Sequence, residues 1–166
     1  MHKISPMLWF DNQAEQAAEQ YISVFSKRPG SGRGECRILD LSRYGEAGPG
    51  PTGSVMVVRF LLEGHEFSAL NGGPQPFRFS EAISFVVYCD SQEEVDYFWS
   101  ALSEGGEEGP CGWLKDRFGL SWQVTPTGME QMLNDPDQEK AQRAMRAMLG
   151  MKKIDIAALQ RAFAGD

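Results

Sequence analysis

Residues 111–126, CGWLKDRFGLSWQVTP, contain many of the side chains in this chain that could bind or transform a small molecule. The segment holds a thiol, two indoles, an ammonium and an amide, arranged in two strand-like runs around the turn DRFG at 116–119. Strand alternation predicts one shared face for Cys111, Trp113 and Lys115. In the second run it places Gln123 and Trp122 on opposite faces, so that only one of them points into the core.

Cys111 is the one thiol of this segment, and catalysis by it would require a neighbouring group that lowers its pKa. Lys115 lies four residues further along the predicted strand, and no histidine is near in the sequence. We therefore favour Cys111 as part of the wall of a binding site over Cys111 as a nucleophile.

Two more candidates lie in the first half of the chain. Asn71, in ALNGGP, ends a strand-like run before two glycines, where its amide either stabilises the turn or points into a cleft. Both interpretations stay open. Trp9 lies on the strand face opposite to Leu8 and Phe10, so it faces away from a helix if those two residues pack against one.

Metal-binding residues are few. The two histidines, His2 and His65, exclude a site of two histidines and one carboxylate within one subunit. The three cysteines are widely spaced and form no CxxC pair, which indicates reduced thiols rather than zinc ligands. Four scattered carboxylates are interpreted as surface groups: Asp40, Glu66, Glu107 and Glu108. We expect no metal and no cofactor.

The composition is that of a soluble globular protein, with 42% hydrophobic residues in 166 and no apolar run long enough to span a membrane. The net charge of -7 disfavours nucleic acid as a partner, because such binding depends on clustered Lys and Arg. The first residues, MHKISPMLWF, show no signal peptide, so we expect a cytoplasmic protein.

Periodicity predicts a strand, a helix and three strands in the first half, at 3–10, 11–25, 35–45, 53–64 and 65–71. The second half begins in the same way, with a strand at 81–90, a helix at 91–106 and the two runs 111–115 and 120–124. DNQAE at 11–15 matches DSQEE at 90–94, and the apolar helix faces match best at an offset of 81. We interpret this as a degenerate βαβββ duplication.

The C-terminal part is predicted to be helical. Thr127 and Glu130 fit a capping box, a helix is expected from Asp135 to Gly150, and a last one begins at Asp155. The apolar stripe of the long helix favours a packing role, and we expect a homodimer to which it contributes: Ala141, Met145, Met148 and Leu149. The predicted organisation is paired modules over 1–126 (1–78 and 79–126), with 127–166 as a helical extension of the same domain.

In this order, the stretches PMLWFDNQAEQAAEQYISVF, EAISFVVYCDSQEEVDYFW and GGEEGPCGWLKDRFGLSWQVTP resemble the PhnB-like branch of the vicinal oxygen chelate superfamily. RYGEAGPGPTGSVMVVRFLLEGHEFSALNGGP and KAQRAMRAMLGMKKIDIAAL add to the resemblance. It implies an α+β fold of paired βαβββ modules, as in glyoxalases, bleomycin-resistance proteins and extradiol dioxygenases. Members of this branch often carry the label demethylubiquinone methyltransferase.

The resemblance also implies where metal ligands would lie, on the first and last strands of each module. Those positions fall on Ile4 or Ser5, Ile83 or Ser84, Ser68 and Gln123. Only Gln123 could coordinate a metal. The methyltransferase label is not supported by a glycine-rich strand-to-helix turn, because the glycines at 45, 48, 50 and 53 lie in a proline-broken connection between two strands.

Three hypotheses for function follow. The first is a metal-independent module that binds a small molecule on a concave sheet lined by Trp9, Asn71, Ser84, Trp113 and Gln123, with Cys111 beside them. The second is an enzyme whose metal site is rebuilt across a dimer from Gln123 and a carboxylate such as Glu66 or Glu107. The third is an interaction role of the Met-rich tail. No reaction can be assigned.

Overall fold

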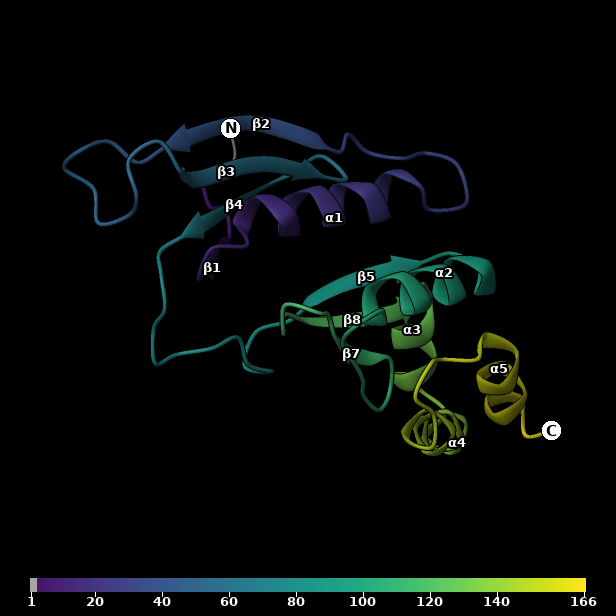
Figure 1. Ribbon diagram of the computed structural model, residues 1–166. Coiled ribbons are helices and arrows are strands. Elements are labelled where there is room, and N and C mark those ends of the chain that lie inside the picture. The colour runs from purple at the N-terminus through teal and green to yellow at the C-terminus, as the bar shows by residue number, and fades with distance from the viewer. Residues whose placement is uncertain (1–2) are drawn as a thin grey trace. The chain divides into compact units, whose positions relative to one another are not determined.

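The computed structural model describes residues 3–166, so Met1 and the candidate histidine His2 lie outside the described part (Figure 1). The chain divides into two compact units, residues 1–78 and residues 79–166. Each unit contains one four-stranded sheet and a helix that packs on it.

The first unit has the order β1 (Met7–Phe10), α1 (Ala14–Ser26), β2 (Arg37–Arg43), β3 (Val55–Leu62) and β4 (His65–Asn71). Its strands lie in the order β1-β4-β3-β2. The β1–β4 pair is parallel and the other two pairs are antiparallel. The strand expected over 3–10 begins only at Met7.

The second unit repeats this topology with β5 (Phe85–Cys89), α2 (Gln92–Ser103), β6 (Glu107–Glu108), β7 (Trp113–Lys115) and β8 (Ser121–Pro126). The sheet order is β5-β8-β7-β6, again with one parallel pair, β5–β8. The predicted duplication of a βαβββ module is therefore confirmed. Sequence patterns did not reveal β6, since two glutamates carry no strand periodicity.

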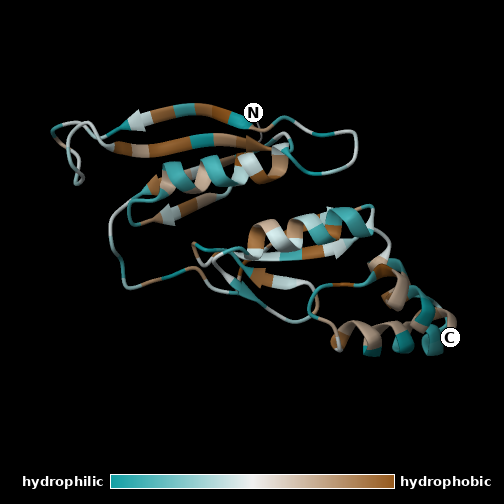
Figure 2. Cartoon of the chain, turned by 45° about the vertical axis from the view of Figure 1, so that its right-hand side comes forward, coloured by the Kyte–Doolittle hydropathy of each residue, from teal (hydrophilic) through white to brown (hydrophobic). Residues whose placement is uncertain are grey.

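The apolar spacing of each helix determines its packing. All five predicted positions of α1 are buried: Ala14, Ala17, Ala18, Tyr21 and Phe25. The predicted face of α2 is buried as well: Val95, Phe98, Trp99 and Leu102. Hydrophobic and hydrophilic residues alternate around both helices in Figure 2, as expected for helices that bury one side. Burial of each large side chain contributes about 1.5–3 kcal/mol.

The N-terminus of α2 is capped by its own sequence. The Ser91 hydroxyl accepts a hydrogen bond from the Glu94 backbone N–H at 3.2 Å, while the Glu94 carboxylate accepts from the Asp90 N–H at 2.7 Å. This is a close variant of the capping box. The box predicted at Thr127 and Glu130 is wrong, because Thr127 instead donates to the Asp90 carboxylate at 2.7 Å.

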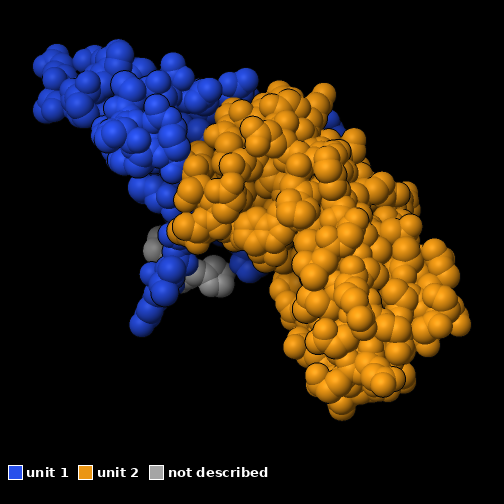
Figure 3. Space-filling view, turned by 90° about the horizontal axis from the view of Figure 1, so that it is seen from below, with its two compact units in different colours: residues 1–78 blue, residues 79–166 orange. Residues whose placement is uncertain are grey.

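The tail belongs to the second unit (orange in Figure 3) and forms α3 (Met129–Leu133), α4 (Gln138–Leu149) and α5 (Ile156–Ala164). Asp155 caps α5 as expected. The cap of α4 is Asp137 rather than the predicted Asp135, whose carboxylate accepts from the Asp137 N–H. A small core of buried side chains holds the three helices together: Met129, Ala144, Ile154 and Leu159.

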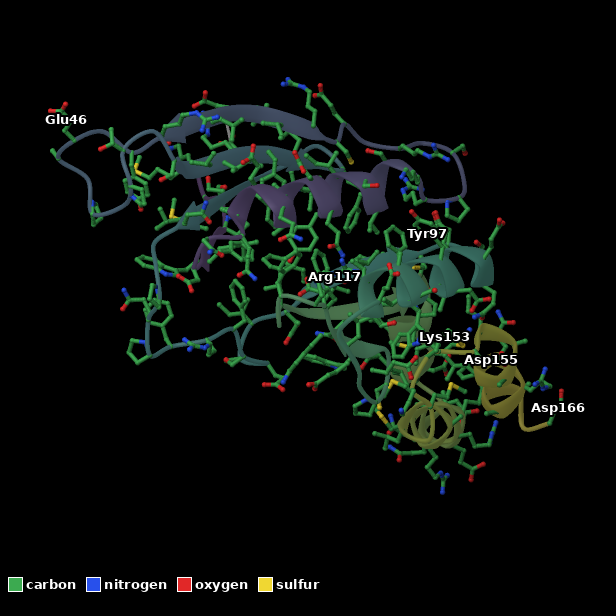
Figure 4. All side chains as sticks on the ribbon, in the orientation of Figure 1. Glu46, Tyr97, Arg117, Lys153, Asp155 and Asp166 are labelled. Carbon is green, nitrogen blue, oxygen red and sulfur yellow. The ribbon has the colours of Figure 1, made fainter. Side chains whose placement is uncertain are left out.

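Gln92 of α2 anchors the tail to the body of the unit. Its amide donates to the Ile154 carbonyl at 3.1 Å and accepts from the Ile156 N–H at 2.9 Å. Lys153, labelled in Figure 4 with Asp155, pairs with Asp96 of α2 at 2.6 Å. None of the helices in residues 3–166 combines the length and apolar character needed to cross a membrane.

Candidate functional site

Each sheet buries one face against its helix and exposes apolar side chains on the other. In β5, Val87 and Cys89 are buried, whereas Val86 and Tyr88 are 41% and 59% exposed. We call the face of the second sheet opposite α2 the open face. Its residues, on the strands or next to them, are Ser84, Val86, Tyr88, Trp113, Lys115, Ser121 and Gln123.

The hairpin β7–β8 has the predicted turn, with the Gly119 N–H donating to the Asp116 carbonyl at 2.8 Å. Trp122 is 2% exposed and belongs to the helix-facing core, as expected if Gln123 faces the other side. The register places Gln123 opposite Trp113, and Ser121 opposite Lys115. The predicted alternation is thus confirmed for Trp113, Lys115, Trp122 and Gln123.

Asp116 is the structural centre of this turn, and the sequence interpretation missed it. Its buried carboxylate accepts hydrogen bonds from the N–H groups of Phe118 and Leu120 and from the indole of Trp122, at 2.9, 3.0 and 2.8 Å. Two signals pointed to this role: an aspartate that opens a tight turn, and a core tryptophan whose N–H needs an acceptor.

Ser84 and Gln123, two of the predicted site residues, are in direct contact. The Gln123 amide donates to the Ser84 hydroxyl at 2.8 Å, between the start of β5 and the neighbouring strand β8. Trp113 lies directly across from Gln123 on β7. Three of the six candidates therefore lie together on the open face.

A cavity of about 360 Å³ opens beside them, at the β6–β7 edge. Its walls include Trp113, Lys115, Ser121, Glu81, Glu107 and Glu108, and we call it the Ser121 pocket. Ser121 is 1% exposed, and its hydroxyl has no hydrogen-bond partner in the part of the chain that the structure describes. The wall of the pocket thus includes a residue whose buried hydroxyl has unused bonding capacity.

Lys115 forms an ion pair with Glu81, with 2.6 Å between Nζ and the carboxylate oxygen. The hydrogen bond with Glu81 raises the pKa of Lys115, and the charge of Glu107 adds to the rise. The same hydrogen bond lowers the pKa of the Glu81 carboxyl. Both groups therefore stay charged at neutral pH, so Lys115 is an ammonium and not a general base.

Cys111 is not part of the pocket wall. The strand predicted over 111–115 begins at Trp113, because Cys111 and Gly112 have positive φ angles of 56° and 83°. Their N–H groups donate to the carbonyls of Met151 and Lys152, in the connection that leads to α5. The backbone here thus connects the sheet to the tail, and alternation does not extend to Cys111.

The two first-half candidates, Trp9 and Asn71, lie in the first unit. Trp9 is on the strand face opposite α1, its indole donates to the Gly73 carbonyl at 3.0 Å, and its ring contacts Phe77 edge-on. The Asn71 side chain accepts from the Ala14 N–H and donates to the Val55 carbonyl. Asn71 thus joins the start of α1 to β3, and it also lies in the wall of a cavity of about 610 Å³ in the first unit.

The residues at the positions implied for a metal do not fit a metal. Ser84 and Gln123 bond to each other, and Ser68 lies opposite Met7. Residues 3–166 contain no group of three His, Cys, Asp or Glu side chains arranged to hold a metal ion. No chemical step is therefore derived through a metal.

The two sheets of identical topology define an α+β protein of paired βαβββ modules, the fold of glyoxalase and bleomycin-resistance proteins. A PhnB protein from Bacillus cereus, proposed to be a 3-demethylubiquinone-9 3-methyltransferase, is 33% identical with a TM-score of 0.64; the match covers 76% of this chain and 100% of that one. Protein PA1353 from Pseudomonas aeruginosa shares the fold at 22% identity and a TM-score of 0.58, over 76% of this chain and 98% of its own.

The model of the 3-demethylubiquinone-9 3-methyltransferase family matches residues 2–125. The chain belongs to this family, and the resemblance to PhnB proteins is confirmed. The match ends before the tail, so the helices from Met129 onward lie beyond it. No curated protein matches the chain.

Proposed function

We propose that this protein binds a small organic molecule in the Ser121 pocket. The observation that carries the proposal is the Ser121 hydroxyl, which is buried, without a partner and adjacent to a cavity. A buried hydroxyl without a partner costs about 1–3 kcal/mol, so native proteins seldom keep one without a reason. A ligand with a hydrogen-bonding group would satisfy it.

Trp113 and Pro110 supply apolar surface to the same cavity. A pocket of mainly apolar walls with a few placed polar groups is the usual design of a small-molecule site. The ligand we propose therefore has an aromatic or aliphatic body and at least one group that donates to, or accepts from, a hydroxyl.

Binding, rather than catalysis, is the activity that the residues support. Lys115 is held as an ammonium by Glu81, and Cys111 lies outside the pocket. The family name denotes methyl transfer, but the sheets have only one parallel pair each and lack the glycine-rich strand-to-helix turn of a doubly wound nucleotide site. A metal-dependent reaction with Gln123 as ligand is disfavoured because Gln123 already bonds Ser84.

We also propose that the protein is a homodimer. The tail stripe gives little support, because Ala141 is buried, Met148 packs within the tail core, and only Leu149 is strongly exposed. Support comes instead from the apolar side chains that β1 and β5 expose, among them Met7 and Tyr88.

The test of binding uses the indole N–H signal of Trp113 in NMR spectra, assigned by a Trp113→Phe variant. A library of fragments of about ten heavy atoms is screened, and we expect some of them to shift this signal. Ser121→Ala should lower the affinity for those fragments about threefold to tenfold, as expected for the loss of one hydrogen bond. The exposed Ser100→Ala, on α2, is the matched control and should leave affinity unchanged.

The same pair of variants separates function from stability. Removing a hydroxyl without a partner costs the fold little, so Ser121→Ala should match or exceed the wild type in thermal midpoint. If no fragment shifts the Trp113 signal, or if Ser121→Ala binds every fragment as tightly as the wild type, the proposed pocket is wrong.

A further inference from the structure

The charges around the Ser121 pocket are unequal. Its walls carry three carboxylates, Glu81, Glu107 and Glu108, against the single ammonium of Lys115. Glu81 is neutralised by Lys115 at 2.6 Å. Glu108 is partly neutralised by the Lys152 ammonium at 3.6 Å, and it also accepts a hydrogen bond from the Trp99 indole at 3.1 Å.

Glu107 is the carboxylate left over. It lies opposite Lys115 in the β6–β7 pair, so both side chains leave the same face of the sheet. Lys115 is already bonded to Glu81, and across residues 3–166 no ion pair to Glu107 is found. The charge of Glu107 acts on Lys115 without a direct ion pair, and the three carboxylates outnumber the ammonium of Lys115, so the open mouth of the pocket is negative overall.

Trp113 lies two residues from Lys115 on the same strand and also lines the cavity. The face of an indole attracts organic cations, and the attraction is stronger where water is excluded. A carboxylate beside an aromatic face is the arrangement that selects an ammonium group attached to an apolar body. The net charge of -7 for the chain adds a long-range attraction for cations.

We propose that the Ser121 pocket selects protonated amines with an aromatic or aliphatic body. This inference rests on the proposed function and adds the charge class of the ligand. Glu107 and the face of Trp113 hold the ammonium, and the Ser121 hydroxyl bonds a polar group deeper in the cavity. An anionic ligand is rejected, because it would have to displace Glu81 from Lys115 and would face Glu107.

The test compares three probes with the same phenyl body and different charge: 2-phenylethylamine, 2-phenylethanol and 3-phenylpropionate. Binding is followed at pH 7 and low salt through the indole signal of Trp113. We expect the amine to bind about fivefold more tightly than the alcohol, and the carboxylate to bind most weakly. Added salt should weaken the binding of the amine and leave the binding of the alcohol unchanged.

Glu107→Gln should lower the affinity for the amine to that for the alcohol and leave the alcohol itself unaffected. Glu104→Gln is the matched control, because Glu104 is a nearby exposed carboxylate outside the pocket wall. It should keep the preference for the amine. Equal thermal midpoints of both variants and the wild type would show that folding is not the cause.

The outcomes distinguish the two proposals. If the alcohol or the carboxylate binds as tightly as the amine, or if Glu107→Gln keeps the preference, the selection of amines is wrong while the pocket stands. If none of the three probes shifts Trp113 and the fragment screen fails as well, the proposed function is wrong and the inference falls with it.

Discussion

At the scale of single residues, two carboxylates of this protein have contrasting environments. Asp116 is buried and fully used by three N–H donors, whereas Glu107 is exposed and has no ion pair in the described chain. Buried charges are retained where hydrogen bonds replace their water. Asp116 therefore stabilises the hairpin, and Glu107 is available to a ligand.

Replacing Asp116 tests its structural role. Asp116→Ala leaves two backbone N–H groups and the Trp122 indole without an acceptor, so we expect a loss of about 2–4 kcal/mol in the free energy of unfolding. Urea denaturation followed by tryptophan fluorescence measures it. Arg117→Ala, in the same turn but exposed, should change stability by no more than about 0.5 kcal/mol. Equal effects of the two variants would contradict this account of the turn.

Glu63 gives the protein a defined response to acid. Burial raises the pKa of its carboxyl, but the hydrogen bonds from Arg28 and the Gly34 N–H, together with the positive charges of Arg28 and Arg33, hold the pKa below its ordinary value of 4.5. Because the folded pKa lies below the unfolded one, the stabilisation is complete above about pH 4.5 and is lost as the pH falls through the lowered folded value.

Glu63→Gln should therefore be less stable than the wild type at pH 7, and the gap should close as the solution becomes more acidic than pH 4.5. Unfolding curves at a series of pH values measure the gap. Glu46→Gln, at an exposed site without a hydrogen-bond or ion-pair partner in residues 3–166, is the control and should follow the wild type. A gap that does not change with pH would mean that the charge of Glu63 is not the stabilising feature.

At the scale of elements, sequence periodicity predicted which side chains of a helix or strand face the core. The buried faces of α1 and α2 and the opposite orientations of Trp122 and Gln123 follow from spacing, because a helix or strand presents every third to fourth, or every second, residue to the core. Ser84 and Gln123, which the family resemblance placed on the first and last strands of the second module, are in direct contact. Local hydrogen bonding decided the rest, as at the cap Asp137 and at Cys111, where the backbone has a positive φ.

The pocket itself was not predictable from these patterns. Its walls combine the short strand β6 and the connection that follows it to Trp113 with Glu81 before β5, which lies far from them in sequence, and these segments have no shared period. Ser121 reads as an ordinary strand residue, and only the structure shows its hydroxyl to be buried and without a partner.

Gln92 tests how an element is anchored. Gln92→Ala removes the amide that bonds the backbone of Ile154 and Ile156. We therefore expect faster hydrogen exchange over 153–164 and a loss of about 1–2 kcal/mol in the free energy of unfolding. The neighbouring Glu93→Ala is exposed and should leave exchange in α5 unchanged. Unchanged exchange in Gln92→Ala would mean that the tail core of Ile154 and Leu159 holds the tail without this anchor.

At the scale of the whole molecule, duplication produces two sheets of the same order, each ending in a parallel strand, β1 in one and β5 in the other. Within residues 3–166 these strands each pair on one side only, and they expose Met7, Trp9, Val86 and Tyr88. An apolar edge strand left open promotes association with other chains, and native proteins usually protect it. A second copy of the chain is the partner we propose to cover these surfaces.

Light scattering coupled to size-exclusion chromatography tests this arrangement. We expect a mass of twice 18.5 kDa for the wild type at micromolar concentration. Tyr88→Glu should shift the protein toward the monomer, because it places a charge among the exposed apolar residues of β5. Leu149→Glu places the same charge on the exposed end of α4 and should leave the mass unchanged. A monomeric wild type would refute the dimer, and dissociation by Leu149→Glu alone would place the contact on the Met-rich tail instead of the sheets.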